Sequence, residues 1–579
     1  MLMGGKCRLM GVRCWALAVG CWLIGVVAVS STTHHPSPTT QSPSPDTRFF
    51  PPVDYDISLA GNFGEPRPHH FHGGLDIKTD GVEGKHIYAI GDGYVSRVTV
   101  GLYGFGNAVY VTHPTGHTSV YCHLKSFSPR IQAALRRYQY AHETSVADAT
   151  FSPLELPVSQ GQFIALSGNT GHSTAPHLHL ELHDTRSWDM LDPYEFLSDF
   201  INDTVPPQAH NFMACPQDRH SGFNGSSRNQ TFAFTAHQLP TRFTAWGRVG
   251  FALYADDYMQ GSYNHYGIRQ TRLLVDGQEV FHSVVNRIPV AQNRLVNSWG
   301  DYDYWNRHHV WYMRSYVEPG CTLPILSADQ RRGIVDFSEQ RDYRLEYVLS
   351  DYQGNESRYE FVVRGVPAPA DADSETPPEE GTPFLWDQTN SYSQPGMQLV
   401  VPYGLLANNV ILHPKVKEIN VLNALSDSYT FSEHSLPLLS DAIFSLYVQC
   451  PVEDASKLYI ASGGHFMGGD YRDGWVYGQI RELGAWYELA YDDEPPQVSP
   501  ISLDRRLVLN VTDTGAGLAT WTATIDGRFV VFDAVEKTTK YVCDLQETWL
   551  PQTGATHQLK FVATDNRQNT RTLETTFVY

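Results

Sequence analysis

The sequence predicts a mostly β protein, in which an N-terminal antiparallel-sheet domain is followed by several β-sandwich modules. Its 579 residues are too many for one domain of ordinary size, so several domains are expected. Aromatic residues make up 12% of the chain, and 46 glycines punctuate it. Short alternating segments rich in Val, Thr and Tyr, separated by Gly, Asn and Asp, are typical of strands joined by turns.

The first 30 residues are predicted to be a signal peptide. Lys6, Arg8 and Arg13 form a basic start, an apolar run of about 16 residues covers 14–29, and residues 28–30 (AVS) resemble a cleavage site. A membrane span needs roughly 20 apolar residues, so we expect cleavage and export to the periplasm, the cell envelope or the extracellular medium. The alternatives are an uncleaved membrane anchor and a lipid anchor at Cys21, because residues 17–21 (LAVGC) loosely resemble a lipobox.

Composition sets the next two boundaries. Residues 31–46 are rich in Ser, Thr and Pro and are predicted to be a linker. Residues 47–202 are predicted to be the first folded domain. Its strands are expected to be short and β-branched, as at 94–100 and 108–112, and to form an open antiparallel sheet with a groove.

Three further modules are expected after residue 202. Residues 203–208 (DTVPPQ) and 493–498 (DEPPQV) resemble the entry into bacterial immunoglobulin-like modules, which places such sandwiches at 203–366 and 492–579. Each contains an Asp-Gly pair, at 276–277 and 526–527, between alternating apolar runs, a strong hairpin signal. Residues 367–383 read as an acidic Pro-rich linker and 384–491 as another β-sandwich, in which 397–406 resembles the start of a ZU5 module.

Charge and cysteine content limit the possible functions. The formal net charge of −20 argues against nucleic-acid binding and against electrostatic docking to anionic surfaces. Of the 8 cysteines, three lie in the leader, and the remaining odd number is no disulfide framework. At most one disulfide is expected, between Cys215 and Cys321. The aromatic run 299–311 could stack on sugars, but packing inside a β-sandwich is the more common role of such residues.

Four motifs in the first domain carry the chemistry. They are residues 72–76 (HGGLD), 121–124 (YCHL), 167–171 (SGNTG) and 177–179 (HLH). A catalytic zinc needs three N or O ligands and one open position. His177 and His179 lie two apart in an alternating stretch, so both point to one face of a strand, where one can bind metal and the other can face a substrate. Imidazole titrates near pH 6.5 and suits the proton transfers of hydrolysis.

These motifs, in this order and spacing, resemble the LytM/lysostaphin-type M23 metallopeptidases over residues 50–197. The resemblance implies that His72, Asp76 and His179 bind one Zn²⁺ per chain. It implies that His123 and His177 flank the reacting water as general base or acid and stabilise the oxyanion. It also implies hydrolysis of peptide bonds in the stems or cross-links of bacterial peptidoglycan, so peptidoglycan or a muropeptide is the expected substrate.

The sequence departs from the family in three places. Some members have a tyrosine shortly before the first ligand, but residues 64–71 (GEPRPHHF) contain none. Cys122 stands where a small residue is common. An insertion spans 125–156, and its residues 129–140 predict a short amphipathic helix that is either a wall of the groove or a plain surface helix. Of the remaining histidines, His70 and His172 are expected to line the groove.

Three functional hypotheses follow. The first is an exported zinc endopeptidase that cuts peptidoglycan peptides. The second is a non-enzymatic scaffold of the same fold that binds the wall or regulates another hydrolase. The third is a zinc endopeptidase acting on Gly-rich or other proteins. In each case the β-sandwich modules could bind a cell-wall component or an envelope protein.

Overall fold

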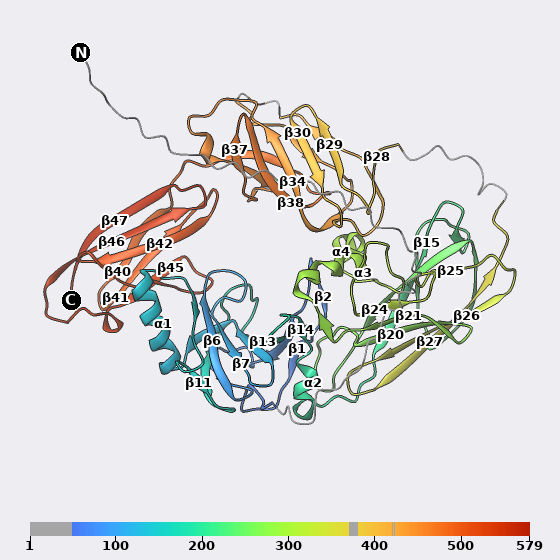
Figure 1. Ribbon diagram of the computed structural model, residues 1–579, viewed down its shortest axis with the longest axis horizontal. Coiled ribbons are helices and arrows are strands. Elements are labelled where there is room, and N and C mark those ends of the chain that lie inside the picture. Colours follow the sequence, from blue (N-terminus) through green and yellow to red (C-terminus); the bar gives the residue numbers. More distant parts are fainter. Residues whose placement is uncertain (1–48, 370–379, 420, 422) are drawn as a thin grey trace, which may run out of the picture. The chain divides into compact units, whose positions relative to one another are not determined.

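The computed structural model describes residues 49–369, 380–419, 421 and 423–579. The predicted signal peptide and Ser/Thr/Pro linker, and most of the predicted acidic linker, lie outside these residues. Strands dominate the described chain, as the sequence predicts (Figure 1). Within the described ranges we find no helix both long and apolar enough to cross a membrane.

The N-terminal domain is built on one antiparallel sheet that contains β13 (His177–Asp184) between β4 and β8. Strands β6, β7 and β13 run side by side in Figure 1, with β8 between the last two. The predicted strands at 94–100 and 108–112 are confirmed as β6 and β7. The order across the sheet is β1 (Leu59–Gly61), β4 (Gly74–Lys78), β13, β8 (His117–Cys122), β7 (Ala108–Thr112), β6 (Gly93–Val100) and β10 (Ala147–Thr150).

A smaller sheet and a helix complete this domain. The sheet has the order β5 (His86–Tyr88), β12 (Phe163–Ser167) and β9 (Leu124–Phe127). The helix expected in the insertion is confirmed as α1 (Pro129–His142). Its proline at the start suits the first turn, where no intrahelical N–H bond is lost. Ile131, Ala134 and Leu135 point into the core, so one face of α1 is packed.

The next module has two sheets around an aromatic core. Phe212 lies at its centre and stacks on Phe361 with ring centroids 4.2 Å apart. One sheet has the order β17 (Gln230–Ala233), β15 (Gln208–Pro216), β19 (Arg248–Asp256) and β23 (Met313–Arg314). The other contains β16 (Gly222–Phe223), β18 (Gln238–Trp246), β27 (Glu356–Gly365), β26 (Asp342–Ser350), β20 (Gln270–Val275), β21 (Gln278–Val284) and β24 (Leu326–Ala328).

Both predicted Asp-Gly hairpins are present. Asp276 and Gly277 have φ of 52° and 80° and join β20 to β21. Asp526 and Gly527 have φ of 48° and 79° and join β42 (Leu518–Ile525) to β43 (Arg528–Phe529). Two successive residues with positive φ define the turn that matches the twist of paired strands, and Asp and Gly tolerate that conformation.

The last two modules are also strand-rich. The first of them is centred on β29 (Asn390–Gln394), β30 (Met397–Val401), β34 (Pro437–Tyr447), β38 (Trp475–Glu482) and β37 (Asp470–Arg472). The final module pairs β40 (Gln497–Leu503), β41 (Arg506–Thr512), β45 (Lys540–Asp544) and β44 (Asp533–Ala534), and, in a second sheet, β43, β42, β46 (Thr556–Asp565) and β47 (Thr570–Val578). The immunoglobulin-like character of the modules stays a prediction.

The N-terminal domain continues into the next module through shared structure. Strand β14 (Met190–Leu191) pairs with β22 (Arg287–Ile288), and the Tyr266 hydroxyl donates to the Leu59 carbonyl at 2.9 Å. Met259 and Tyr266 are buried in the core of the N-terminal domain. The boundary expected at residues 202 and 203 therefore stays a prediction, because core and sheet contacts cross it.

The expected disulfide is wrong. All five cysteines of the described chain are free thiols. Cys215 packs among Met213, Ala252 and Tyr316, whereas Cys321 lies against a different apolar cluster, the one that contains Trp299. The two residues belong to different clusters of the same module, which the spacing of cysteines in the sequence cannot reveal. In the aromatic run at 299–311, Trp299 and Tyr302 are buried, whereas Tyr304, Trp305 and Trp311 are half-buried, so the core interpretation holds for only part of the run.

Candidate metal centre and active site

Sheet register brings the predicted ligands together. Strand β4 pairs with β13 so that Asp76 lies opposite His179, and His72 stands in the turn just before β4. Because side chains two apart on a strand share a face, His177 and His179 both point to the side that carries Asp76. The H-x3-D and H-x-H motifs are thus joined by one antiparallel strand pair.

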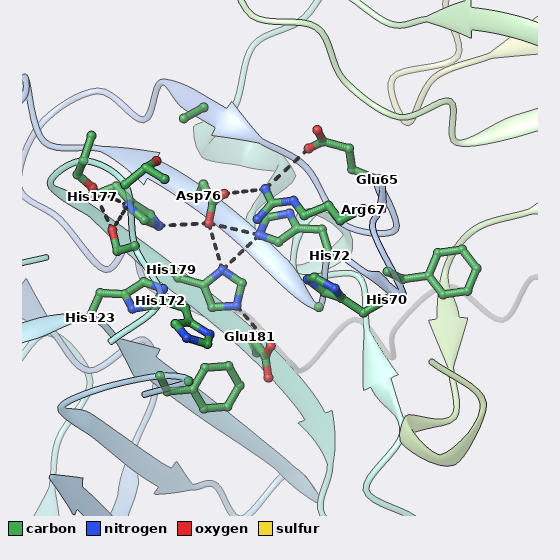
Figure 2. A pocket seen from close by; sticks show the side chains of 18 of the residues that line it. Glu65, Arg67, His70, His72, Asp76, His123, His172, His177, His179 and Glu181 are labelled. Atoms are coloured by element: carbon green, nitrogen blue, oxygen red, sulfur yellow. Dashed lines mark hydrogen bonds and ion pairs between the residues drawn. The ribbon is translucent and has the colours of Figure 1, made fainter. Parts of the chain in front are cut away.

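Three side chains converge closely enough to hold a metal ion. His72 Nε2 and His179 Nδ1 lie 3.0 and 2.8 Å from Asp76 Oδ1, and the two nitrogens are 2.9 Å apart. Figure 2 shows the three side chains pointing toward one another. The three side chains are buried, with residue exposures of 2% for His72, 7% for Asp76 and 6% for His179. Two nitrogens and one carboxylate oxygen are a donor set that suits zinc.

A second layer of groups orients these ligands. His72 Nδ1 donates to the Asn62 carbonyl at 2.6 Å, which leaves its Nε2 for the ion. His179 Nε2 lies 3.0 Å from Glu181 Oε1, and His183 Nε2 lies 2.7 Å from the other oxygen of the same carboxylate. Partners of this kind fix ring orientation and tautomer at metal sites.

Asp76 is held from its other side. Arg67 Nη2 donates to Asp76 Oδ2 at 2.7 Å, and Arg67 also lies 3.6 Å from Glu65 (Figure 2). The charge and hydrogen bonds of the surrounding histidines keep the pKa of Asp76 well below its usual value, although burial alone would raise it. The carboxylate is therefore ionised, with Oδ1 directed at the two ring nitrogens and Oδ2 occupied by the guanidinium.

The two further histidines stand beside the ligands with matching tautomers. His123 Nδ1 donates to the Thr170 carbonyl at 2.7 Å, and His177 Nδ1 donates to the Ala175 carbonyl at 2.8 Å. The Nδ1 of each ring thus binds a backbone carbonyl, and the His177 Nε2 lies 3.3 Å from Asp76 Oδ1. The ring centroids of His123 and His177 are 5.0 Å apart. His123 has a φ of 59°, an uncommon backbone conformation for a residue other than glycine.

Burial controls the protonation of the rings. It lowers the pKa of His72 to about 4 and that of His123 to about 3, so both are neutral near pH 7. For His179, burial acts in the same direction, but hydrogen bonds to Asp76 and Glu181 outweigh it and raise the pKa to about 9. Two carboxylates thus favour a positive charge at this ring, and a metal ion at Nδ1 supplies that charge in place of a proton.

The five predicted site residues line one open groove of about 1040 Å³. His70 and His172 line it too, as expected from the sequence. No residue of the insertion at 125–156 is among the lining residues, so α1 is not a groove wall. The next module contributes part of the lining instead, through Tyr263, Asn264, Val290 and Asn293.

Sequence reasoning missed several of these residues. Glu181 could have been found, because it continues the alternation of His177 and His179 on one strand face. Arg67 lies in a short Pro-rich stretch with no periodic signal, and Asn62 acts through its backbone carbonyl. The position of the missing tyrosine is not filled within 64–71, although Arg67 and His70 from that stretch line the groove.

Comparison with known proteins matches two parts of the chain to families. Residues 70–140 match Peptidase family M23, and residues 381–492 match the Zu5-like domain. The chain carries an M23 peptidase domain. The matched stretch contains His72, Asp76 and His123, and the sheet register described above places His177 and His179 of the same M23 domain beside them. The ZU5 resemblance of residues 397–406 is also confirmed.

Two curated relatives match about a fifth to a quarter of the chain. An uncharacterized metalloprotease of Haemophilus influenzae is 33% identical over 120 residues, which is 21% of this chain and 19% of that protein. The peptidoglycan DD-endopeptidase ShyA of Vibrio cholerae is 31% identical over 137 residues, 23% of this chain and 26% of that protein. The chain thus spans about a fifth to a quarter of the length of these relatives.

A solved structure also matches part of the chain. The catalytic domain of the antimicrobial peptidase lysostaphin from Staphylococcus simulans is 25% identical, covering 24% of this chain and 92% of that domain, with a TM-score of 0.19.

Proposed function

We propose that this protein is an exported zinc metalloendopeptidase that hydrolyses peptide bonds in the stems or cross-links of bacterial peptidoglycan. The single observation that carries the proposal is the convergence of His72 Nε2, Asp76 Oδ1 and His179 Nδ1 at the floor of an open groove. The family match of residues 70–140 and the name of the Vibrio cholerae relative support it.

The donor set supports zinc as the metal. His72, Asp76 and His179 would hold the ion, leaving one position open toward the groove. Zinc supplies a Lewis acid and lowers the pKa of water to about 7, which provides a nucleophile near neutral pH. Glu181 and the Asn62 carbonyl hold the two imidazole rings in the orientation that this task needs.

His123 and His177 would carry the protons. Each Nδ1–H is committed to a backbone carbonyl, so Nε2 is the atom left on each ring for proton transfer. One Nε2 accepts a proton from the attacking water, and a protonated Nε2 then donates to the leaving amine. Burial lowers the pKa of His123, so the free ring is neutral at neutral pH.

The groove supports an extended peptide as the substrate. Its volume of about 1040 Å³ exceeds that needed for a single side chain. Its lining mixes histidines and carboxylates with apolar residues such as Phe105, Met190 and Trp188. The matched relatives that act on the wall support a location in the envelope or outside the cell, which agrees with the expected signal peptide.

The test is a digest of purified sacculi by residues 47–579, with and without zinc, read by mass spectrometry of released muropeptides. We expect cross-linked dimers to disappear only with the zinc-loaded protein, and the products to name the bond. His123→Ala is the matched control, because it removes a proton carrier and leaves the three ligands in place.

Two other results would redirect the proposal. Stoichiometric zinc without turnover on any muropeptide would favour the scaffold hypothesis. Cleavage of Gly-rich peptides from a library, with intact sacculi left untouched, would favour a protease that acts on proteins instead of the wall.

A further inference from the structure

A second buried cluster of ionisable groups lies away from the M23 ligands, where the M23 domain meets the next module. Asp203, Asp257 and Asp351 each place a carboxylate oxygen within 4.8 Å of the others. They are 5%, 4% and 6% exposed. Three carboxylates with so little contact with water repel one another strongly unless a cation or a proton stands among them.

One oxygen of this cluster has no partner. Asp257 Oδ1 is buried and accepts no hydrogen bond from any described group. The other two side chains are held in place: Asp203 Oδ1 accepts from the Val205 N–H at 3.0 Å, and Asp351 accepts from the backbone and side-chain amides of Asn355 at 2.9 and 2.6 Å. A buried, unpaired carboxylate oxygen is costly, so the structure requires something beside it.

A small cavity lies beside two members of the cluster, Asp203 and Asp257. It has a volume of about 20 Å³, and Asp203 and Asp257 line it together with Asn62, Tyr194 and Arg269. A space of this size holds a single water-sized species. The arginine does not neutralise the cluster, because its guanidinium is engaged by Asp192 at 2.7 Å and by Glu195 at 2.5 Å.

From this arrangement we propose that Asp203, Asp257 and Asp351 bind a calcium ion in the module next to the M23 domain, close to the boundary between them. All three donors are hard oxygens, which disfavours zinc and copper. Magnesium keeps several of its waters, and a cavity of about 20 Å³ has no room for them. Calcium accepts carboxylates from irregular loops at 2.3–2.6 Å and tolerates varied geometry.

The position of the ion gives it a role at the groove. Asp257 opens the loop that ends at Tyr266, since the two residues form an isolated bridge. This loop carries Tyr263 and Asn264 into the lining of the catalytic groove. The Asn264 amide donates to the Ala60 carbonyl at 3.1 Å, in the strand that pairs with β4. An ion at Asp257 therefore holds one end of the segment that forms a wall of the groove.

A related arrangement recurs in the last module. Asp492, Asp513 and Asp565 also approach within 4.8 Å, and Asn569 binds Asp565 through its backbone and side chain as Asn355 binds Asp351. Within the described chain none of these carboxylates has a buried oxygen left unpaired. The proposal therefore concerns the first cluster, and the second provides an internal comparison.

The competing explanation is a shared proton. Burial, followed by the charges of Asp203 and Asp351, raises the pKa of Asp257 to about 8. A neutral Asp257 would relieve the repulsion without any metal. The two explanations differ in their response to calcium at fixed pH, which makes them separable by experiment.

The experiment is calcium titration of the zinc-loaded chain in resin-treated buffer at pH 7.5, followed by calorimetry and thermal melting. We expect saturable binding and, at 100 times the Kd, an increase in melting temperature of about 5–10 °C. Asp257→Asn should lose that binding event and the increase, while melting no lower than wild type without calcium, because one repelling charge is gone. Asp329→Asn, which removes an exposed charge of the same module, should behave as wild type.

Three outcomes would overturn the proposal. The first is that the melting temperature of the wild type does not change with calcium up to about 10 mM, which exceeds the Kd range of extracellular calcium modules. The second is an equal change with magnesium, and the third is an Asp257→Asn variant that binds calcium as the wild type does. Should that variant fail to fold, Asp351→Asn and the wild-type titration decide alone. None of these readouts uses catalysis, so the result is independent of the proposed hydrolase activity.

Discussion

Two of the ionisable clusters in the described part of the chain differ in how their side chains are partnered. In the M23 domain, every ligand has a second partner: the Asn62 carbonyl for His72, Arg67 for Asp76 and Glu181 for His179. In the carboxylate cluster, three like charges face one another and Asp257 Oδ1 has no partner. In the first cluster each ligand is paired with a second protein group, whereas in the second cluster a cation or a proton is needed to offset the repulsion between the carboxylates. The two clusters can thus be distinguished by the hydrogen-bond partners of their side chains.

The largest expected effect is the removal of an M23 ligand. His179→Ala should abolish stoichiometric zinc binding and reduce turnover on the order of 10⁴-fold or more, because the metal and the nucleophile are lost together. Zinc content by mass spectrometry and muropeptide release measure the two losses. Full activity in a metal-free His179→Ala protein would exclude the proposed chemistry.

Removal of a proton carrier should separate binding from turnover. His123→Ala is expected to keep stoichiometric zinc and to lower kcat by about 10²–10⁴-fold, with little change in KM. The ring binds the Thr170 carbonyl through Nδ1 and makes no bond to the three ligands, so the metal is retained. Loss of zinc in this variant would show that His123 is structural.

A smaller effect is expected at the second layer. Glu181→Gln keeps the shape of the side chain but removes the charge that His179 and His183 share, so zinc affinity should fall roughly 10–100-fold. Competition with a chromogenic chelator measures this change, and zinc added in excess should restore turnover. If added zinc fails to restore turnover, Glu181 contributes to more than metal affinity.

The smallest effect concerns the recurrent cluster in the last module. Asp513 accepts the Gly517 N–H at 2.8 Å, and Asp492 accepts two backbone amides, so these carboxylates are already partly satisfied. Asp513→Asn should therefore reduce the calcium-dependent melting increase by less than half as much as Asp257→Asn does. Equal reductions in the two variants would mean that unpaired oxygen is not what distinguishes the clusters.

Much of the candidate site could be predicted because its information is local. His177 and His179 are two apart on a strand, and His72 and Asp76 are four apart at a strand start, so each pair is visible in the sequence. The predicted hairpins and α1 have local signals of the same kind. The family pattern then joins the separate motifs, although no single motif reveals that β4 and β13 are neighbours.

The parts of the fold and of the site that the sequence did not predict depend on contacts between segments far apart in the chain. Asn62 binds Gly267 across 205 positions, and the loop that ends at Tyr266 enters the groove of a domain that ends long before it. The carboxylate cluster draws on three loops of one module, none of which has a ligand motif by itself. The failed pairing of Cys215 with Cys321 has the same origin, because residues of one module can still lie in separate clusters.

The strand pairing between β14 and β22 has a consequence for how such proteins diversify. Since the neighbouring module supplies Tyr263, Asn264, Val290 and Asn293 to the groove, an excised peptidase domain would lack part of its groove lining. Exchanging the module by recombination would alter substrate selection while leaving every catalytic residue untouched. In this architecture, new cleavage preferences can be acquired outside the enzyme domain itself.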